Sequence, residues 1–437
     1  MANDGIGSLW RVTRLAIIGT GYVGLTTGAC FAHLGHDVVC ADIDADKVER
    51  LSRGEIPIVE HRLDELVNRG LKRGNLSFVL GAAAAVAECE IAFLCVPTPQ
   101  GEDGSADLSY VESAAREIAA VLPYECIVVN KSTVPVGSTK VVERVMRRPD
   151  VRVVSNPEFL REGSAVDDFL NPDRVVVGSD DRAAAVAVGA LYESIRAQVI
   201  VTDPASAETI KYAANAFLAT KLSFINAIAA ICEGVGADVN DVVVGMGYDK
   251  RIGTEFLRPG PGWGGSCFPK DSRALLKIAN DAGYDFDLLS GVIAVNDEQF
   301  DRVTDKIRVA AGGSLAGATV AVWGLTFKAR TDDVRDSPSL AIIERLVAAG
   351  ASVRAFDPTV PSLRTGVPAE ITLCADPYAA TQGAQALAVL TEWDEFKWLE
   401  PTKVAEVMTG RGVVDGRNLL DRNDWQRAGF SYQGIGR

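Results

Sequence analysis

A cysteine at the predicted N-terminus of a helix is the residue whose type and position best suit a nucleophile. Cys267 lies in the run Gly264–Asp271, GGSCFPKD. Since proline suits the first turn of a helix, Pro269 predicts that Cys267 comes just before that turn, where free N–H groups and the helix dipole favour a thiolate. Lys270 adds positive charge, and Asp271 is a candidate proton carrier. The pattern predicts a nucleophilic thiol, and a buried small residue beside a glycine turn is the alternative.

The sequence argues against a histidine base near this thiol and against a zinc or redox site built on a cysteine pair. The chain has three histidines, and all of them lie within its first 61 residues. No two of the eight cysteines have the C-x-x-C spacing of a zinc or redox site. A base near Cys267 must therefore be lysine, glutamate, aspartate or water, and the scattered thiols suit a reducing compartment.

Further candidate groups come from one predicted helix and one predicted strand end. Residues 206–234 have an alanine-rich helical pattern, in which Lys211 and Asn215 are four apart and share a small or apolar face. A lysine on such a face is better explained as a buried ammonium that stabilises an oxyanion than as a surface group. Glu158 and Glu162 follow a predicted strand, and one of them is a candidate for handling water or protons, against the alternative of a solvated pair.

The elements that would position a cofactor lie near the start of the chain. A strand at 15–18 runs into Gly19–Gly24 (GTGYVG), a helix of small residues follows, and a second strand ends at Asp42. This is the order of a βαβ unit whose glycines let a pyrophosphate approach the backbone. Asp42 has the spacing of an acid that binds a ribose hydroxyl, and Asp42 and Asp44 would repel a 2′-phosphate. The expected cofactor is therefore NAD, and a purely structural tight turn is the alternative.

Three more strand-like runs end in polar or proline-rich loops. The runs are 91–96, 127–130 and 151–154, and the loops begin Pro97-Thr98-Pro99, Lys131-Ser132-Thr133 and Ser155-Asn156-Pro157-Glu158. Ligands of open α/β sheets bind outside the carboxyl ends of the strands, so these loops are expected to line one site. Thr133 is there a candidate hydrogen-bonding partner for a catalytic water, with a turn residue as the alternative.

The second half of the chain repeats this layout without the glycine motif. A strand, a helix at 338–349 and a second strand at 352–357 follow the order of the first βαβ unit, but Leu325–Lys328 (LTFK) replaces GxGxxG. The change argues against a second dinucleotide site. It suggests that Lys328 contacts a nucleotide or phosphate of another kind, and a surface lysine on a packing domain is the alternative.

Length and composition agree with an enzyme of several domains. The chain has 437 residues, 48% of them hydrophobic and 23% charged, and its net charge of −14 argues against nucleic acid and anionic membranes as partners. Without a signal-peptide pattern or an uninterrupted apolar run of membrane length, it is predicted to be cytoplasmic. We expect an α/β fold of two Rossmann-like, doubly wound parallel-sheet domains joined by a long central helix. The predicted domains are 12–205, which binds NAD, 206–312, which is central and helical, and 313–437, which is Rossmann-like. The family resemblance described next implies that the second forms a dimer and that the third binds a UDP-sugar.

The separated motifs together resemble the UDP-glucose/GDP-mannose dehydrogenase family from about residue 14 to residue 420. The blocks that carry the resemblance include Gly19–Leu25, Val96–Pro99, Lys131–Gly137, Pro157–Glu162, Glu208–Asn215, Gly264–Asp271, Gly324–Lys328 and Asp415–Arg417. The resemblance implies a homodimer that oxidises the primary alcohol of UDP-glucose to the carboxylate of UDP-glucuronate, using two NAD molecules in turn. The same chemistry on GDP-mannose or a UDP-N-acetylhexosamine is the alternative, and the block Arg251–Asp271 favours UDP-glucose.

The resemblance also implies roles for the candidate residues. The catalytic set is Cys267, Lys211, Asp271, Glu158, Thr133 and Asn215. Cys267 would form a thiohemiacetal and then a thioester, Lys211 would stabilise oxyanions or shuttle a proton, and Glu158 would assist hydrolysis. The implied NAD-binding residues are Gly19, Gly21, Tyr22, Val23, Gly24, Asp42, Lys47, Thr98, Thr133, Glu162, Lys270 and Arg335. The implied substrate-binding residues are Glu158, Phe159, Leu160, Lys211, Asn215, Arg251, Phe256, Leu257, Arg258, Gly264, Cys267, Phe327, Lys328 and Arg417.

Two other classes of protein stay as alternatives. A single-step hydroxyacid dehydrogenase shares the cofactor domain but does not use a cysteine nucleophile, and a silent NAD-binding scaffold has no need of Cys267, Lys211 and Asp271 together. Within the resemblance, Arg251 is expected to reach the substrate across a dimer interface, and residues 256–265 to cover the diphosphate. Trp263 departs from the smaller aromatic that the family generally carries in that loop.

Overall fold

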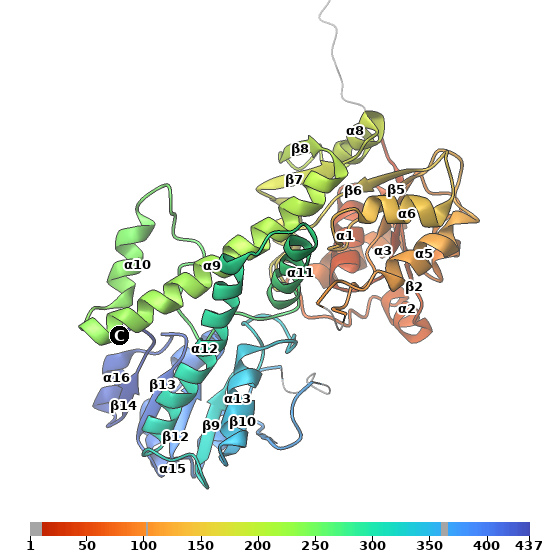
Figure 1. The fold of residues 1–437 in the computed structure, drawn as a ribbon. Helices are drawn as coiled ribbons and strands as arrows, with labels where there is room; N and C mark the ends of the chain where they lie inside the picture. The colour runs from red at the N-terminus through yellow and green to blue at the C-terminus, as the bar shows by residue number, and fades with distance from the viewer. Residues whose placement is uncertain (1–10, 102–103, 360–365) are drawn as a thin grey trace, which may run out of the picture. The chain divides into compact units, whose positions relative to one another are not determined.

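The computed structural model describes residues 11–101, 104–359 and 366–437. The chain forms two compact units, Met1–Lys211 and Tyr212–Arg437, and each has its own sheet (Figure 1). The boundary falls inside helix α9 (Pro204–Val235), which is 32 residues long. Pro204 is at its first turn, and no glycine interrupts it before Gly234, so its alanine-rich sequence can form one continuous helix.

Helix α9 is also the one helix in the described ranges whose length and composition would suit a membrane span, because its most apolar 18 residues have a mean hydropathy of 1.4. Of these residues, 44% are buried inside the protein. The core helix of a globular protein can be equally long and apolar, so the helix is weak support for a membrane location.

The sheet of the first unit has eight strands in the order β3-β2-β1-β4-β5-β6-β7-β8. The strands are β1 (Arg14–Ile18), β2 (Asp37–Asp42), β3 (Leu76–Leu80), β4 (Ile91–Leu94), β5 (Ile127–Asn130), β6 (Arg152–Ser155), β7 (Arg174–Gly178) and β8 (Gln198–Thr202). Neighbouring strands are parallel except β6 and β7, which pair antiparallel between Ser155 and Gly178. The strand order reverses direction at β1 and β4, so the loops after these two strands flank the crevice where such sheets bind ligands.

Helices cover both faces of this sheet because apolar side chains alternate along its strands. Leu15 and Ile17 of β1 pack on one face, and Ala16 and Ile18 pack on the other. The first face is covered by α1 (Tyr22–His33), α3 (Leu63–Arg73), α7 (Ala165–Leu170) and α8 (Arg182–Ala190). The second face is covered by α4 (Ala82–Val86), α5 (Ser109–Ala119) and α6 (Ser138–Met146), and α2 (Ala45–Ser52) follows β2.

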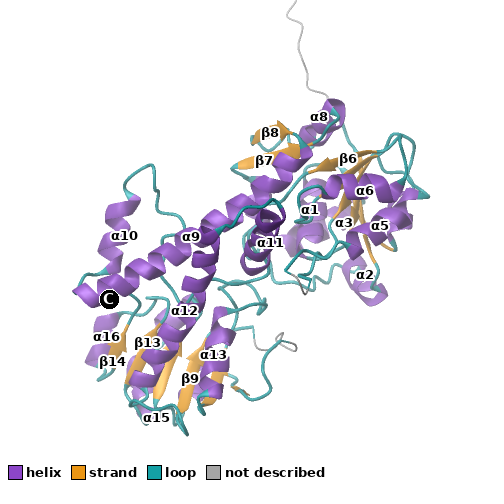
Figure 2. Cartoon of the chain, viewed as in Figure 1, coloured by secondary structure: helices purple, strands orange, loops and turns teal. Residues whose placement is uncertain are grey.

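The sheet of the second unit has six strands, all parallel, in the order β11-β10-β9-β12-β13-β14 (Figure 2). The strands are β9 (Thr319–Trp323), β10 (Ser352–Phe356), β11 (Thr372–Leu373), β12 (Ala386–Val389), β13 (Gly412–Asp415) and β14 (Ser431–Gln433). The helices are α10 (Val239–Gly247), α11 (Phe268–Asp281), α12 (Asp287–Ala310), α13 (Pro338–Ala348), α14 (Pro377–Thr381), α15 (Pro401–Val407), α16 (Arg422–Arg427) and the 3-10 helix η1 (Asp394–Trp398). Val320 and Val322 face one core, and Ala321 and Trp323 face the other.

The predicted fold class, two parallel-sheet domains and a long central helix, is confirmed. The strand predicted at 127–130 has those bounds, and the strand predicted at 91–96 ends at Leu94, just before the proline-rich loop. The central helix begins at Pro204, two residues before the predicted start. The antiparallel β6–β7 pair was not predicted and is the one departure from a fully parallel first sheet.

Candidate functional site

The carboxyl ends of β1 and β4 form a cradle in which Gly19 and Gly24 leave no room for a side chain. Gly19 has a φ of +96°, and a Cβ there would lie 2.7 Å from the carbonyl oxygen of Cys95. A Cβ on Gly24 would lie 1.9 Å from the oxygen of Gly19, whereas a Cβ on Gly21 would meet no atom within 4 Å. Helix α1 begins at Tyr22 without a side-chain cap, so its first N–H groups can bind an anion. The pyrophosphate of a dinucleotide fits this cradle.

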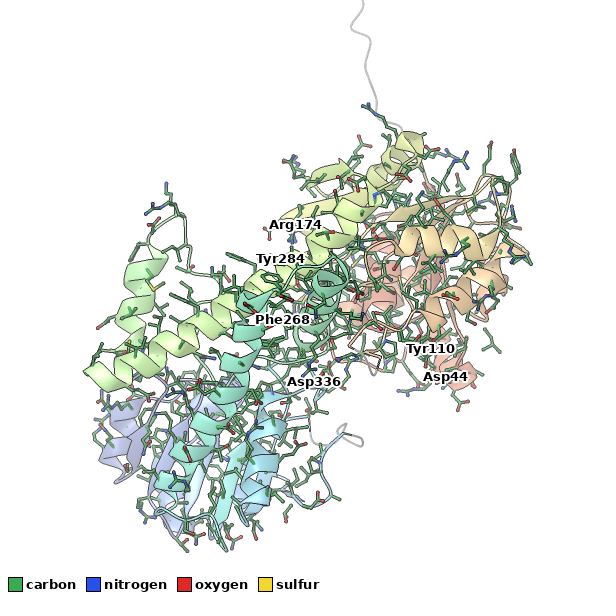
Figure 3. The ribbon with its side chains drawn as sticks, in the orientation of Figure 1. Asp44, Tyr110, Arg174, Phe268, Tyr284 and Asp336 are labelled. Atoms are coloured by element: carbon green, nitrogen blue, oxygen red, sulfur yellow. The ribbon has the colours of Figure 1, made fainter. Side chains whose placement is uncertain are left out.

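Asp42, at the end of β2, carries a stable negative charge beside the cradle. Its Oδ2 accepts hydrogen bonds from Thr20, through both N and Oγ1, and from Lys47 Nζ at 3.0 Å. Burial raises the pKa of Asp42, but these hydrogen bonds outweigh burial and lower it to about 2. Asp44, labelled in Figure 3, caps α2 by accepting from Lys47 N at 3.1 Å. The expected cofactor residues Asp42 and Lys47 are therefore an ion pair at this sheet edge.

The loops that follow β4 and β5 contact each other. Thr98 Oγ1 donates to the carbonyl oxygen of Thr133 at 2.9 Å, and Ser132 Oγ donates to the oxygen of Val96 at 2.6 Å. The two threonines expected near the cofactor thus lie together at the carboxyl edge of the first sheet. The third expected loop, after β6, begins at Asn156, whose N–H donates to the oxygen of Asn130 at 2.9 Å.

The loop after β6 holds a buried ion pair. Lys211 Nζ lies 2.9 Å from Glu158 Oε1, and their side chains are 4% and 5% exposed. Glu158 Oε2 accepts a hydrogen bond from Leu160 N, which fixes the carboxylate from its other side. The ring centre of Phe159 lies 3.6 Å from the guanidinium of Arg174, labelled in Figure 3, and 5.4 Å from Lys211 Nζ. Lys211 is thus an interior ammonium, and its chemical role stays a prediction.

In the second unit, Cys267 is the residue immediately before helix α11, which begins at Phe268 and has Pro269 in its first turn. The other seven cysteines are buried, and Cys267 is only partly so. Cys267 therefore combines partial exposure with a position at a helix N-terminus. Its role as a nucleophile stays a prediction.

The glycines before Cys267 let the chain approach a neighbouring loop. A Cβ on Gly264 would lie 1.9 Å from the carbonyl oxygen of Asp336, and Gly265 has a φ of +82° with the ring of Phe327 2.8 Å from its Cβ position. Gly265 N donates to the oxygen of Asp336 at 3.3 Å. The segment that carries Cys267 thus packs on the loop that replaces the glycine motif in the second unit.

A buried carboxylate lies one turn into α11. Asp271 is fully buried, its Oδ2 accepts from Asn215 Nδ2 at 2.6 Å, and its Oδ1 accepts from Lys270 Nζ at 2.7 Å. Asp271 N donates to the carbonyl oxygen of Cys267 at 2.8 Å. Three of the predicted catalytic residues, Cys267, Asp271 and Asn215, are therefore linked, and Lys270, expected to bind the cofactor, holds Asp271 here.

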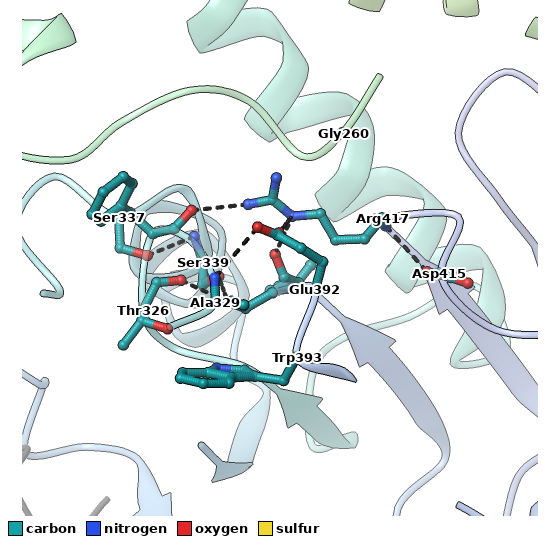
Figure 4. Close-up of polar contacts among 12 residues, drawn as sticks. Gly260, Thr326, Ala329, Ser337, Ser339, Glu392, Trp393, Asp415 and Arg417 are labelled. Carbon is teal, nitrogen blue, oxygen red and sulfur yellow. Dashed lines mark hydrogen bonds and ion pairs between the residues drawn. The ribbon is translucent and has the colours of Figure 1, made fainter. Parts of the chain in front are cut away.

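Arg417 connects three loops of the second unit (Figure 4). Its Nε donates to the oxygen of Leu390 at 2.8 Å and lies 3.0 Å from Glu392 Oε2, while its Nη2 donates to the oxygen of Phe327 at 3.0 Å. Its Nη1 is the nearest atom, at 3.4 Å, to the position of a Cβ on Gly260. The loop at 256–265, the predicted diphosphate cover, therefore approaches Arg417 and Phe327.

The turn after β9 has the geometry of the turn after β1, but the carboxylate of its acidic residue, Asp357, is fully hydrogen-bonded within the protein. Gly324 has a φ of +95° and donates to the oxygen of Phe356 at 2.8 Å, as Gly19 donates to Ala41 at 2.8 Å. Asp357 takes the place of Asp42, and its Oδ2 accepts from Leu325 N, Thr326 N, Thr326 Oγ1 and Trp393 Nε1, while Oδ1 accepts from Thr359. Asp357 is fully buried, so it has no oxygen left for a ribose hydroxyl, in agreement with the missing GxGxxG.

Several predicted residues lie apart from these contacts. Arg251 is 89% exposed and forms a forked ion pair with Asp249, and Arg335 is 65% exposed and forms one with Asp333. Arg258 is also exposed, Leu257 is buried, Phe256 has a φ of +62°, and Lys328 Nζ lies 5.2 Å from the ring centre of Phe327. Trp263 is a core residue whose Nε1 donates to Ser223 Oγ at 2.8 Å, so its size serves packing.

Sequence reasoning missed some residues that hold these groups in place. Glu60 accepts from Tyr22 OH at 2.8 Å and from Gly163 N at 2.7 Å, and so connects the glycine motif with the loop after Glu162. No motif signals Glu60. Lys131 directly follows the predicted strand 127–130, and Glu392 comes shortly after β12 (Ala386–Val389). A charged residue after a strand was a signal for the sheet edge where ligands bind, but it did not indicate which side chains each residue contacts.

Comparison with known proteins agrees with this geometry. Models of the UDP-glucose/GDP-mannose dehydrogenase family match residues 13–196 with the NAD binding domain, 205–298 with the central domain and 321–422 with the UDP binding domain. A UDP-glucose 6-dehydrogenase of Bacillus subtilis is 46% identical over 430 residues, which are 97% of this chain and 93% of the relative.

Two solved structures share the fold over nearly the whole chain. A UDP-glucose dehydrogenase from the archaeon Pyrobaculum islandicum is 36% identical with a TM-score of 0.91, over 99% of each chain. A UDP-D-ManNAc dehydrogenase from Pyrococcus horikoshii is 28% identical with a TM-score of 0.86, over 97% of this chain and 99% of that one. With all three domains matched in order, the chain belongs to the UDP-glucose/GDP-mannose dehydrogenase family of NAD-dependent oxidoreductases.

Proposed function

We propose that this enzyme oxidises UDP-glucose to UDP-glucuronate in two successive steps through a cysteine thioester. The observation that supports it most is the placement of Cys267: it lies at the N-terminus of α11, it is the one cysteine that is not buried, and Asp271 lies fixed in the turn after it. NAD, held by Gly19–Gly24, Asp42 and Lys47, supplies the hydride acceptor when it is bound.

In the first oxidation, the primary alcohol loses a proton and a hydride and becomes an aldehyde. Negative charge develops on the alcohol oxygen as its proton leaves. The buried ammonium of Lys211 stabilises this charge, because a cation in a low-dielectric site acts more strongly than one in water. Glu158, paired with Lys211 at 2.9 Å, orients the ammonium and provides a place for a proton.

In the second oxidation, the thiol of Cys267 adds to the aldehyde carbon. The carbon–sulfur bond forms, the thiol proton moves to the carbonyl oxygen, and a thiohemiacetal results. Loss of that proton and of a second hydride leaves a thioester. Water then adds, the carbon–sulfur bond breaks, and the thiol and a carboxylate are released. The residues proposed for this step are Asp271 and Thr133, for the water, and Glu158, for its proton.

The nucleotide is assigned to the second unit. Arg417, Phe327 and the loop at 256–265 meet there, and Lys328 lies on the ring of Phe327. A guanidinium suits phosphate or ribose oxygens, and the glycines of the loop let its backbone approach a diphosphate. The relatives with 46% identity favour UDP-glucose, and a UDP-N-acetylhexosamine or GDP-mannose is the alternative substrate.

The enzyme is further proposed to be a cytoplasmic homodimer. Phe217, Phe224 and Ile231 are spaced seven residues apart on α9 and are 65%, 48% and 58% exposed, so they form one apolar stripe. A second copy of the chain would cover this stripe. In such a dimer the exposed Arg251 reaches the substrate of the partner subunit. The eight free cysteines suit a reducing compartment.

The stoichiometry of NADH formed per UDP-glucose consumed tests the proposal. The reaction is run to completion with excess NAD, and two NADH per sugar are expected. The variant Cys267→Ser should lose acid formation, while Cys374→Ser, at a buried cysteine of the second unit, should keep it. One NADH per sugar in the wild-type enzyme would refute the thioester route, and turnover of GDP-mannose or a UDP-N-acetylhexosamine instead of UDP-glucose would change the substrate but keep the chemistry.

A further inference from the structure

A second buried lysine, Lys131, interacts electrostatically with both members of the Lys211–Glu158 pair. Lys131 follows β5 and is 4% exposed. Its Nζ donates to Asn156 Oδ1 at 3.0 Å and to Tyr192 OH at 3.2 Å, and lies 5.6 Å from the ring centre of Tyr192. In the described ranges, no acidic side chain forms an ion pair with Lys131. Among the described residues, the hydrogen bonds of its ammonium are therefore to neutral groups.

An ammonium in such surroundings lowers the stability of the folded protein. Burial lowers the pKa of Lys131 to about 8, Cys95 and Glu158 act to raise it, and Lys211 acts to lower it. Desolvation of a cation is only partly offset by neutral hydrogen bonds and an aromatic ring, and an apolar side chain of similar volume would be more stable here. The presence of a charged residue at a place where the charge lowers stability points to a function for that charge.

The partners of Lys131 connect it to Glu158. Asn156 is fully buried, its Nδ2 donates to the oxygen of Val176 at 2.7 Å, and its Oδ1 accepts from Lys131 and from Tyr192 OH at 2.6 Å. Its backbone N–H donates to Asn130, where β5 and β6 run side by side (Figure 1). Every polar group of this side chain is thus engaged, and Glu158 follows two residues later.

We propose that Lys131 is a positioning residue of the oxidation, which fixes Asn156 and through it the carboxylate of Glu158, and which adds a second positive charge behind the Lys211–Glu158 pair. The inference rests on the function proposed above. Two buried cations and one carboxylate leave an excess positive charge. This excess stabilises an oxyanion of the substrate.

The groups that face Glu158 are few. Lys211 approaches from α9, Lys131 from the end of β5, Cys95 from the end of β4, and Tyr22 from α1. Burial raises the pKa of Cys95 to about 12 and that of Tyr22 still further, so both are neutral at physiological pH. Of these four groups, the two lysines are therefore the ones that carry a positive charge beside Glu158.

The test is the pH profile of kcat for UDP-glucose oxidation in the variant Lys131→Met. The variant removes a buried positive charge that acts on the Lys211–Glu158 pair, so both limbs of the profile should move to higher pH, and kcat at neutral pH should fall about tenfold with a smaller change in KM. The variant Lys131→Arg keeps the charge but alters the geometry, so its kcat should fall while the limbs stay in place. Tyr192→Phe removes one hydrogen bond without a change of charge and should likewise leave the limbs in place.

Lys140→Met is the matched control, because Lys140 is an exposed lysine of the same unit. It should leave kcat and the profile unchanged. A wild-type profile in Lys131→Met would overturn the inference, as would shifted limbs in Lys131→Arg if Lys131→Met does not fold. A wild-type enzyme that leaves UDP-glucose unreacted would instead refute the proposed substrate, and the same profiles would then be measured with the nucleotide sugar that it does oxidise.

Discussion

Asn215 donates a hydrogen bond from Nδ2 to Asp271 Oδ2 at 2.6 Å, and so ties helix α9 to the first turn of the helix that follows Cys267. Lys270 binds the other oxygen of the same carboxylate at 2.7 Å. An amide and an ammonium together keep a fully buried Asp271 in one orientation, with its backbone N–H on the carbonyl of Cys267. In the proposed reaction this orientation serves the water that hydrolyses the thioester.

The first prediction concerns that hydrolysis. Asp271→Asn removes the negative charge and replaces one carboxylate oxygen with an NH2 group. This group is a donor and would face one of the donors Asn215 and Lys270. We expect kcat to fall about a hundredfold, with a rapid burst of NADH before the slow phase, because the thioester forms and then persists. Rapid-mixing kinetics and the intact mass of the quenched enzyme, which should carry one substrate-derived acyl group, check this.

The matched control for Asp271→Asn is Asp281→Asn. Asp281 is the last residue of the same helix and forms an exposed ion pair with Lys277. Surface pairs of this kind contribute little, so kcat should stay within about twofold of the wild type. A burst followed by normal turnover in Asp271→Asn, or no acyl group on the enzyme, would remove Asp271 from the hydrolysis step.

The second prediction concerns the cofactor. Asp42 has a pKa of about 2, below its ordinary value, so its stabilising charge is fully present above pH 4 and is lost as the pH falls towards 2. Titration of this carboxylate should therefore not change NAD affinity between pH 5 and pH 8. Asp42→Asn should weaken NAD binding about tenfold and relax the discrimination against NADP, which calorimetry with each cofactor would measure. An unchanged ratio of the two affinities would show that Asp42 does not face the ribose.

The strands and helices were largely readable from the sequence, because their signals are local. Residues 127–130 are an apolar run that ends in polar residues, and Pro269 marks the start of α11 after Cys267. The interior position of Lys211 followed from the small and apolar residues that share its helix face. In each of these cases the residues that determine the structure lie within a few positions of one another.

The parts that could not be predicted depend on contacts between distant segments. Lys131 is buried because Asn156 and Tyr192, 25 and 61 residues away, supply its hydrogen bonds. Trp263 lies in a loop of glycine and proline, yet Ser223 on α9 accepts its indole N–H and draws it into the core. No spacing or period in the sequence signals either arrangement, because each depends on where the fold brings a partner.

The third prediction concerns the apolar stripe on α9. Phe224→Asp places a charge among Phe217 and Ile231, and burial of that charge in an interface would cost several kcal/mol. With the proposed dimer, the variant should be a monomer at concentrations where the wild type dimerises, as sedimentation measures. Its activity should fall with the loss of the proposed contact between Arg251 and the partner's substrate. Tyr284→Asp, at another exposed aromatic of the second unit, is the control and should not change the mass. A monomeric wild type would refute the proposed dimer.

The last prediction uses the buried charge of Lys131 independently of activity. Its pKa in the folded protein is about 8, against about 10.4 for an unperturbed lysine, so between these values the unfolded chain binds more protons than the folded one. The destabilising charge is fully present below pH 8 and is relieved as the pH rises towards 10. Relative to Lys131→Met, the free energy of unfolding of the wild type should therefore rise by about 3 kcal/mol over this interval. Urea unfolding of both proteins at matched pH values measures the difference, and a difference that does not vary with pH would mean that Lys131 is not an ammonium of lowered pKa.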